Sequence, residues 1–373
     1  MLGLVSISHS VSISMTQMFL FLLLCFYAYL TFTQKNYKLL KSRYALFFLL
    51  FYLAGVLSVL FGIEFSKPLK AIRNYWIYMY LFMGLYFVKT EKDLNTVYFF
   101  TIIGGIISSV YALINTIAGS EHGRAVSFMT HALTLGNMLA IIAILCLTCL
   151  LYKLYENRLQ LYTLLAALPL IYTAVFLTGS RGPILAAITV SILIIITKLK
   201  TKGIIPAVII VLLALGAVKL NPPLQERFTE IGQHEFSNPQ SSIGARIELW
   251  RLSAKIIKEH PIFGIGFNNF RKAIAEHQTQ KIASTAHAHN IFVQHLVLHG
   301  VVGLSTLFLF FGYILKRLMH FRNHKMIIPA LWVMAVFIIC GMTENTLGDS
   351  EVVMLFLFIL GSALGPYEKL NQS

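Results

Sequence analysis

Long apolar segments limit how this chain can fold more than any other feature of its sequence. A helix needs about 20 consecutive apolar residues to cross the hydrocarbon core of a bilayer, and such segments recur along all 373 residues. Hydrophobic residues make up 57% of the chain and charged residues 12%, whereas a soluble domain carries roughly 25% charged residues. The sequence therefore predicts an all-α polytopic membrane protein.

Eleven membrane spans are predicted, and the last of them ends near the C-terminus. They lie at 15–33, 44–62, 72–88, 97–118, 129–152, 159–178, 182–197, 204–220, 289–315, 326–343 and 350–365. With eleven spans the N-terminus is expected to lie outside, and a segment missed within residues 1–14 would raise the number to twelve. The cysteines fall inside spans and are interpreted as small core residues: Cys25, Cys146, Cys149 and Cys340.

Basic residues predict the orientation of these spans. The loops on one side are short and carry most of the lysines and arginines, which by the positive-inside rule makes that side cytoplasmic. These residues are Lys35, Lys38, Lys41, Arg43, Lys89, Lys92, Lys153, Arg158, Lys198, Lys200, Lys202, Lys316, Arg317, Arg322 and Lys325. Membrane orientation thus explains the net charge of +15, and no nucleic-acid partner is expected. The opposite connections would face the periplasm of a Gram-negative bacterium.

The spans divide the chain into three predicted parts. Residues 1–220 form an N-terminal transmembrane bundle of about eight spans, and residues 289–373 supply about three more. Between them, residues 221–288 form a periplasmic loop domain. This domain contains a predicted amphipathic helix over 244–259, which is either an interfacial helix or a surface helix packed on the bundle. Ser242 would cap its start, Pro261 would end it, and its apolar side would carry Ile247, Trp250, Ile256 and Ile257.

Two arginines on the outer side are candidate anion ligands. Arg181 lies in TGSRGP between two spans, and flanking Gly179 and Gly182 would let the backbone approach a ligand closely. Arg246 lies at the start of the loop-domain helix, and an arginine fork suits phosphate oxygens. Arg181 could also be a helix-end anchor. Arg246 by itself is explained as well by an exposed pair with Glu248 or Glu230.

Four histidines lie within thirteen residues where the loop domain enters the next span, at His287, His289, His295 and His299. His289 stands at the start of the span, and imidazole is suited to remove a proton near neutral pH. His295 and His299 share a helix face and are expected to satisfy hydrogen bonds inside the bundle. A metal site is the less favoured alternative for both pairs: the HxxxH pair His295 and His299 lacks the usual third ligand and the Glu of an HExxH motif, and the HxH pair His287 and His289 could also bind a metal.

The last outer turn, GMTENTLGDSE, contains two further candidate residues. Glu344 and Asp349 are the acidic residues of this turn apart from Glu351 just beyond it. A carboxylate there could orient a base. A solvated turn is the simpler interpretation and is the one predicted.

Three segments together resemble the O-antigen ligase and polymerase superfamily. TGSRGP is similar to its short arginine turn, and RIELWRLSAKIIKEHPIFGIGFNNF is similar to its periplasmic signature. HNIFVQHLVLHGVVG matches the ligase pattern of His, a small polar residue, nine residues, Gly, two residues and Gly. In this chain those positions are His289, Asn290, Gly300 and Gly303.

The resemblance implies a C-type glycosyltransferase bundle of about eleven or twelve helices in the bacterial inner membrane. It implies transfer of a glycan from undecaprenyl-diphosphate to a lipid A–core sugar, with inversion and without a metal or other cofactor. His289 would be the general base, Arg181 and Arg246 would bind the diphosphate, and His287 and Asn290 would contact substrate beside them. An O-antigen polymerase, a protein O-oligosaccharyltransferase and a transporter of lipid-linked glycan are the alternatives.

Overall fold

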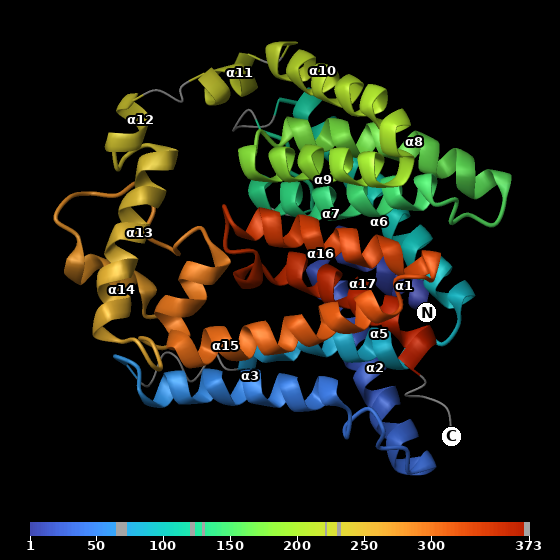
Figure 1. Cartoon of the computed structure of the whole chain (residues 1–373), viewed down its shortest axis with the longest axis horizontal. Helices are drawn as coiled ribbons and strands as arrows, with labels where there is room; N and C mark the ends of the chain where they lie inside the picture. Colours follow the sequence, from blue (N-terminus) through green and yellow to red (C-terminus); the bar gives the residue numbers. More distant parts are fainter. Residues whose placement is uncertain (65–72, 120–123, 129–130, 221, 230–232, 369–373) are drawn as a thin grey trace.

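The structure is a computed structural model that describes residues 1–64, 73–119, 124–128, 131–220, 222–229 and 233–368 (Figure 1). Across these residues the chain forms helices and no strand. Eight helices are long and apolar enough to cross a membrane. The prediction of an all-α polytopic membrane protein is therefore confirmed.

The helices follow one another with short connections as far as residue 220. They are α1 (Leu2–Val11), α2 (Ile13–Gln34), α3 (Arg43–Leu60), η1 (Arg73–Tyr78), α5 (Met79–Phe87), α6 (Glu91–Ile117), α7 (Ala132–Leu151), α8 (Arg158–Leu177), α9 (Arg181–Leu199), η2 (Lys200–Gly203) and α10 (Ile204–Leu220). Beyond them lie α11 (Pro222–Thr229), α12 (Gln233–Ser237), α13 (Ser242–Glu259), α14 (Phe270–His277), α15 (Ile291–His320), η3 (Lys325–Ile327), α16 (Ile328–Gly341), η4 (Thr346–Gly348) and α17 (Ser350–Glu368).

Within the described residues every predicted span falls on helical structure. However, 72–88 is η1 followed by the nine-residue α5, and 326–343 is η3 followed by the fourteen-residue α16, and neither is among the eight helices long enough to cross a membrane. Residue 72 and residues 129–130, at the starts of two predicted spans, lie outside the described residues, as do residue 221 and residues 369–373 at the edges of the predicted parts. The spans at 182–197 and 204–220 are joined by η2 into one continuous helical stretch, Arg181–Leu220, whose two apolar parts are separated by Lys198, Lys200 and Lys202. Figure 1 shows α10 doubling back over α9 after this turn.

The N-terminus departs from the prediction. Residues 2–11 were expected outside the first span, but they form α1, which packs along α6 with Val5 and Ser10 fully buried. The two helices run in the same direction, because Gly3 lies against Phe100 and Gly104 lies against Ile7. α1 therefore starts toward the end of the bundle where α6 starts. The serines of α1 can be buried because Ser6 and Ser8 donate to carbonyls of their own helix, Leu2 O and Val5 O, and Ser108 of α6 donates to Ser10 O.

The centre of the bundle is formed by α7 and α17. In the most apolar 18 residues of each helix, 83% of the residues are buried in α7 and 78% in α17. The corresponding shares are 17% for α2 and 11% for Arg181–Leu220. A helix that is apolar on all sides must be buried in protein or exposed to lipid. α7 and α17 are buried in protein, whereas α2 and α10 are exposed to lipid. The predicted core cysteines Cys146, Cys149 and Cys340 are buried, but Cys25 on α2 is exposed.

The predicted basic loops gather at one end of the bundle, to the right in Figure 1. A shallow pocket there is lined by Lys92, Lys153 and Lys325, which come from three different loops. Arg317 donates to the Glu368 carboxylate at 2.6 Å beside it. α13 and α14 stand across the opposite end, which we call the α13 end.

Helix α13 is longer than predicted, and its buried face is different. It begins at Ser242 with Ser241 as the cap, since the Ser241 hydroxyl accepts from Gly244 N–H at 3.0 Å. The expected apolar side is confirmed at Ile256 and Ile257, which lie in or against the core, but it was wrong at Ile247 and Trp250, which are 42% and 39% exposed. The buried side instead packs on α14 and the start of α15, through Ala245, Leu249, Leu252 and Ile256. The helix is thus packed on the bundle and keeps two large apolar side chains at the surface.

A break in α15 ties the loop after α13 to the bundle. Gly300 has φ 62° and ψ −166°, so the helix is interrupted there and its backbone groups become available to partners. The loop supplies those partners as a short ladder. The bonds are Ile265 N–H to Val297 O (3.0 Å), Gly266 N–H to Leu298 O (2.9 Å), Val301 N–H to Pro261 O (2.9 Å) and Val302 N–H to Ile262 O (3.2 Å).

This ladder explains the glycines of the HPIFGIG and HN-x9-G-x-x-G segments. A Cβ on Gly264 would collide with the Leu298 backbone, and one on Gly300 with the Ile262 carbonyl. Gly303 leaves room for the His299 side chain. Gly264 and Gly266 also adopt positive φ, as the predicted tight turn requires.

Replacing Gly264 by alanine is therefore expected to destabilise the protein. The substitution combines a strained φ of 68°, worth about 1–3 kcal/mol, with a backbone clash. The apparent Tm of the detergent-solubilised protein should fall by several degrees. Gly216→Ala in α10 is the control, because nothing lies within 4 Å of a Cβ there. An unchanged Tm for Gly264→Ala would contradict the packing described for this loop.

Candidate functional site

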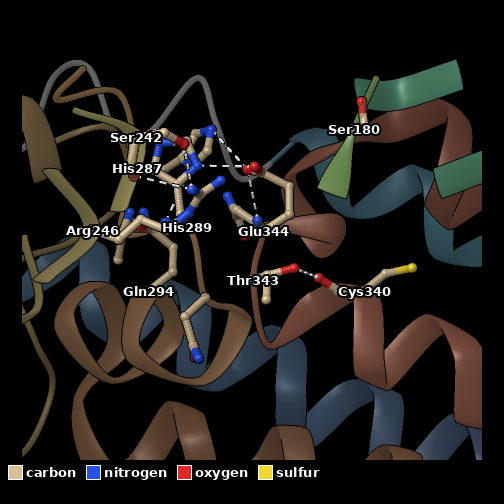
Figure 2. Close-up of polar contacts among 12 residues, drawn as sticks. Ser180, Ser242, Arg246, His287, His289, Gln294, Cys340, Thr343 and Glu344 are labelled. Carbon is tan, nitrogen blue, oxygen red and sulfur yellow. Dashed lines mark hydrogen bonds and ion pairs between the residues drawn. The ribbon is translucent and has the colours of Figure 1, made fainter. Parts of the chain in front are cut away.

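An imidazole–carboxylate pair lies at the α13 end of the bundle (Figure 2). His289 Nδ1 lies 2.9 Å from Glu344 Oε2, and His287 Nε2 lies 3.2 Å from Glu344 Oε1. The histidines precede α15, and Glu344 follows α16. His289 has φ 49°, a left-handed conformation that costs a non-glycine residue energy and is often kept at functional sites.

The solvated turn predicted around Glu344 is wrong. Glu344 is 6% exposed and accepts hydrogen bonds from His289 Nδ1 and from Asn345 N–H, both at 2.9 Å, while its Oε1 lies 3.2 Å from His287 Nε2. Burial acts to raise the pKa of its carboxyl, but the hydrogen bond from His289 and the attraction of both histidines lower the pKa below its usual value. Burial lowers the pKa of His287, although Glu344 opposes that shift. The lowered pKa favours the carboxylate form of Glu344, which faces the rings of His287 and His289.

Asp349, at the other end of the same turn, is partly buried beside Glu351. Burial and the charge of Glu351 raise the pKa of its carboxyl, although Thr134 donates to it. The charge of Glu344 acts on Asp349 in the same direction, so the two carboxyls lie near each other. Among the described residues, the histidines contact Glu344.

Arg246 reaches this cluster from α13. Its guanidinium donates to Ser242 O at 3.0 Å and to Ser242 Oγ at 2.8 Å, while its Nε is buried without a partner among the described residues. Burial lowers the pKa of Arg246, and Glu344 opposes this shift. The alternative pair with Glu248 is excluded, since Glu248 binds Arg251 at 2.5 Å; Glu230 lies outside the described residues.

Arg181 starts α9 and forms an ion pair with Glu235, at 3.2 Å between NH1 and Oε1. The charges of Arg181, Glu235 and Glu344 all act on the guanidinium of Arg246. The two arginines and the two carboxylates therefore lie in one region. The flanking glycines serve packing: a Cβ on Gly182 would meet Thr343, next to Glu344. Arg181, Arg246 and His289, which the sequence places far apart, are thus brought together.

A residue that sequence reasoning missed holds the arginine turn in place. Arg124 donates through Nε to Thr178 O and through NH2 to Ser180 Oγ, both at 2.7 Å. It lies in the 119–128 connection, which carried no motif. Its proximity to the turn depends on the packing of α6 and α7 against α8, so the sequence held no signal for it.

Two further bonds hold the loop that carries the histidines. Trp250 Nε1 donates to Ala288 O at 2.7 Å, and Ala288 N–H donates to Gln294 Oε1 at 2.7 Å. Asn290 caps α15 by accepting from Phe292 and Val293 N–H, and its Nδ2 donates to Met342 O at 3.0 Å. The Asn290 amide is therefore engaged by the protein at both ends, and its contact with substrate stays a prediction.

The histidines deeper in α15 behave differently from each other. His299 Nδ1 bonds with Ser58 Oγ at 2.9 Å, so the hydrogen bond expected for it inside the bundle is confirmed. His295 is 8% exposed, yet neither ring nitrogen has a partner in the described part of the chain. The prediction that His295 satisfies hydrogen bonds inside the bundle is therefore wrong.

The cluster also has a donor set that could hold a divalent ion. One ligand atom each from His287, His289 and Glu344 lie within 4.8 Å of one another, and two histidines with a carboxylate form a common zinc set. The third ligand that the sequence did not reveal is Glu344. However, Arg246 and Arg181 place positive charge beside the same carboxylate. Electrostatics therefore favours an anion next to this pair.

The arrangement combines a base with an anion site. A carboxylate that holds Nδ1 of an imidazole leaves Nε2 to accept a proton and stabilises the imidazolium that results. Guanidinium groups beside it can stabilise negative charge on a leaving group. The cluster is therefore equipped for transfer to a hydroxyl from a donor with an anionic leaving group.

Comparison with known proteins agrees with this interpretation. Residues 164–311 match the family described as O-antigen ligase. An uncharacterized protein of Haemophilus influenzae is 29% identical over 148 residues, so the alignment covers 36% of this chain and 37% of that relative. The family match runs from α8 into α15 and includes Arg181, Arg246 and His289. Over residues 164–311, which are less than half of its length, this multi-pass membrane protein is therefore similar to the O-antigen ligase family.

Proposed function

We propose that this protein is an O-antigen ligase, which transfers a glycan from undecaprenyl-diphosphate to a lipid A–core sugar at the periplasmic face of the inner membrane. The observation that carries the proposal is the pairing of His289 with buried Glu344 in one cluster with Arg246 and Arg181. The α13 end lies opposite the basic loops, as a periplasmic site requires under the positive-inside rule.

In this mechanism His289 removes the acceptor proton. With Nδ1 held by Glu344, Nε2 accepts the proton as the acceptor oxygen attacks the anomeric carbon. A C–O bond to the acceptor forms, the anomeric C–O bond to the diphosphate breaks, and undecaprenyl-diphosphate leaves with the bonding pair. Attack from the face opposite the leaving group inverts the anomeric configuration. No metal is required, because the arginines carry the electrostatic role.

The arginines are placed to receive the diphosphate. The buried Nε of Arg246 lacks a partner in the described residues, and a phosphate oxygen would provide one. Arg181 is held by Glu235, and a diphosphate would compete with that carboxylate for the guanidinium. Charge-assisted hydrogen bonds of this kind strengthen as negative charge builds up on the leaving oxygen.

An apolar groove supports a lipid-linked donor. The groove has a volume of about 160 Å³ and lies between α15, α16 and α17. It begins at Ile291, directly after Asn290, and continues past Phe308 to Gly312 and Leu315 along α15. A prenyl chain in this groove would place its diphosphate at the His289 end of α15.

Filling the groove is expected to weaken donor use selectively. Gly312→Phe adds a large side chain to an open position, since nothing lies within 4 Å of a Cβ there, and should raise KM for the lipid-linked donor about tenfold. The KM for the acceptor should not change. Gly216→Phe in α10, equally open, is the matched control. Equal donor KM values for both variants would remove the groove from the donor site.

The polymerase and the protein O-oligosaccharyltransferase use the same donor chemistry with another acceptor. Deletion of the gene, followed by gel analysis of lipopolysaccharide and of lipid-linked glycan, separates them. Loss of all O-chains with accumulation of polymerised lipid-linked glycan is the result expected for a ligase. A core that bears one repeat unit would show a polymerase, and an unchanged core with lost protein glycosylation would show the third activity.

A further inference from the structure

A large cavity lies beside the His289 cluster and is separate from the apolar groove. Its volume is about 490 Å³, within the range of roughly 300–1,000 Å³ that is typical of small-molecule sites. It is enclosed by α3, η1, the loops at 267–271 and 286–287, α15 and the turn at 345–350. His287 lies at its boundary with the cluster, and Leu347 lines both the cavity and the groove.

The lining combines aromatic rings with neutral hydrogen-bonding groups. Phe51, Tyr75, Tyr78 and Phe267 supply the rings, whereas amides come from Asn74, Asn268, Gln294 and Asn345. The lining contains no carboxylate among the described residues; its guanidinium is that of exposed Arg271, and Arg181 and Arg246 are not part of it. A prenyl chain would leave these amides without partners, and a diphosphate is better served by the two arginines of the cluster. The chemistry therefore suits a sugar ring with several hydroxyls, and Arg271 would also accommodate an acidic group on that ring.

His295 provides an independent sign that this cavity binds a ligand. It lines the cavity, it is 8% exposed, and both ring nitrogens are buried without a partner among the described residues. Phe51 stacks on the ring, with 5.9 Å between centroids, and so holds its orientation. A buried polar group without a partner costs free energy, and proteins seldom retain one that nothing satisfies. A hydroxyl in the cavity would supply the missing hydrogen bonds.

We propose that the cavity is a sugar-binding subsite, in which His295 hydrogen-bonds a hydroxyl and the aromatic rings of Tyr75 and Phe267 pack against the sugar. This proposal rests on the proposed glycan transfer and deepens it. The sugar is either the acceptor at the end of the core or the first sugar of the donor glycan. Both present the same chemistry, and both must reach His289 past His287.

Two pairs of variants of the full-length protein in detergent test the proposal. Ala286→Trp places an indole at an exposed position in the cavity lining, and Ala283→Trp, exposed in the same loop but outside the lining, is its control. His295→Phe removes the ring nitrogens, and His295→Gln restores a donor and an acceptor. His9→Phe, which removes another buried imidazole outside the cavity lining, controls for the cost to folding.

Transfer kinetics with both substrates varied give the first measurement. Ala286→Trp should raise KM for one sugar substrate about tenfold or more, and His295→Phe should raise the same KM about three- to tenfold, as expected for one lost hydrogen bond. His295→Gln should recover most of this loss, and the controls should behave as wild type. A change in acceptor KM assigns the cavity to the acceptor, and a change in donor KM assigns it to the donor glycan. Unchanged KM values for both substrates in Ala286→Trp would overturn the subsite.

A binding measurement distinguishes failure of the subsite from failure of the transferase. The probes are the oligosaccharides released by mild acid from lipopolysaccharide and from the lipid-linked donor, and saturation-transfer NMR reports their contact with the protein. Wild-type protein and Ala283→Trp should saturate one of the two, and Ala286→Trp should not. If transfer is absent in wild type but this pattern holds, the transferase proposal fails and the sugar subsite stands. Equal signals from Ala286→Trp and Ala283→Trp would exclude the cavity.

Discussion

Replacing His289 by alanine is expected to lower the rate of glycan transfer by about 10²–10⁴-fold, the usual contribution of a general base. The variant retains the acceptor and donor sites but cannot remove the proton of the attacking hydroxyl. Initial rates measured with purified protein, and O-chain attachment on lipopolysaccharide gels, both report the effect. Because the His289 side chain lies at the end of α15 and is 18% exposed, the protein should still insert and should elute as a monodisperse peak in size-exclusion chromatography.

Two companion variants make this result specific. His320→Ala removes an exposed histidine at the opposite end of α15 and should transfer glycan at the wild-type rate. Glu344→Gln keeps an oxygen that can accept from His289 Nδ1 but removes the charge that stabilises the imidazolium. Its rate should fall less than that of His289→Ala. Full activity of His289→Ala at normal expression would show that another group takes the proton.

Lysine in place of Arg246 is expected to lower the transfer rate by about 10²–10³-fold, as is typical when one donor to a developing anion is lost. Lysine keeps the charge but has a single ammonium group, so it cannot supply the buried Nε and the terminal nitrogens together. Arg181→Lys should behave similarly. The loss should appear in kcat as well as in donor KM, because charge on the diphosphate increases as the bond breaks.

Arg251→Lys is the matched control for these two variants. Arg251 lies on the same helix as Arg246, but its side chain is 49% exposed and pairs with Glu248. Its replacement should leave kcat and both KM values unchanged. Wild-type turnover of Arg181→Lys and Arg246→Lys together would remove the diphosphate from this cluster.

Local patterns in the sequence predicted the membrane helices and the principal site candidates. An apolar segment such as 204–220 must be helical in lipid whatever surrounds it. Every predicted span therefore falls on helical structure, although 72–88 and 326–343 do not form a single long helix. Arg181, Arg246 and His289 could be identified because each lies in a short motif that is defined by both the types of its residues and their spacing. The break at Gly300 and the buried face of α13 were missed, since each depends on which neighbour the helix meets.

The partners of the site residues could be found only in the folded chain. Glu344 lies 55 residues from His289, and Glu235 lies 54 residues from Arg181, distances at which composition and periodicity carry no information about contact. The same is true of the cavity beside His295, whose walls come from six separate segments. The sequence by itself determined that the chain is a bundle of membrane helices and which residue types its motifs carry, because lipid constrains each segment independently. Only the tertiary structure decided that a carboxylate orients the histidine and that an unpaired imidazole faces a cavity, because those facts depend on packing between helices distant in the chain.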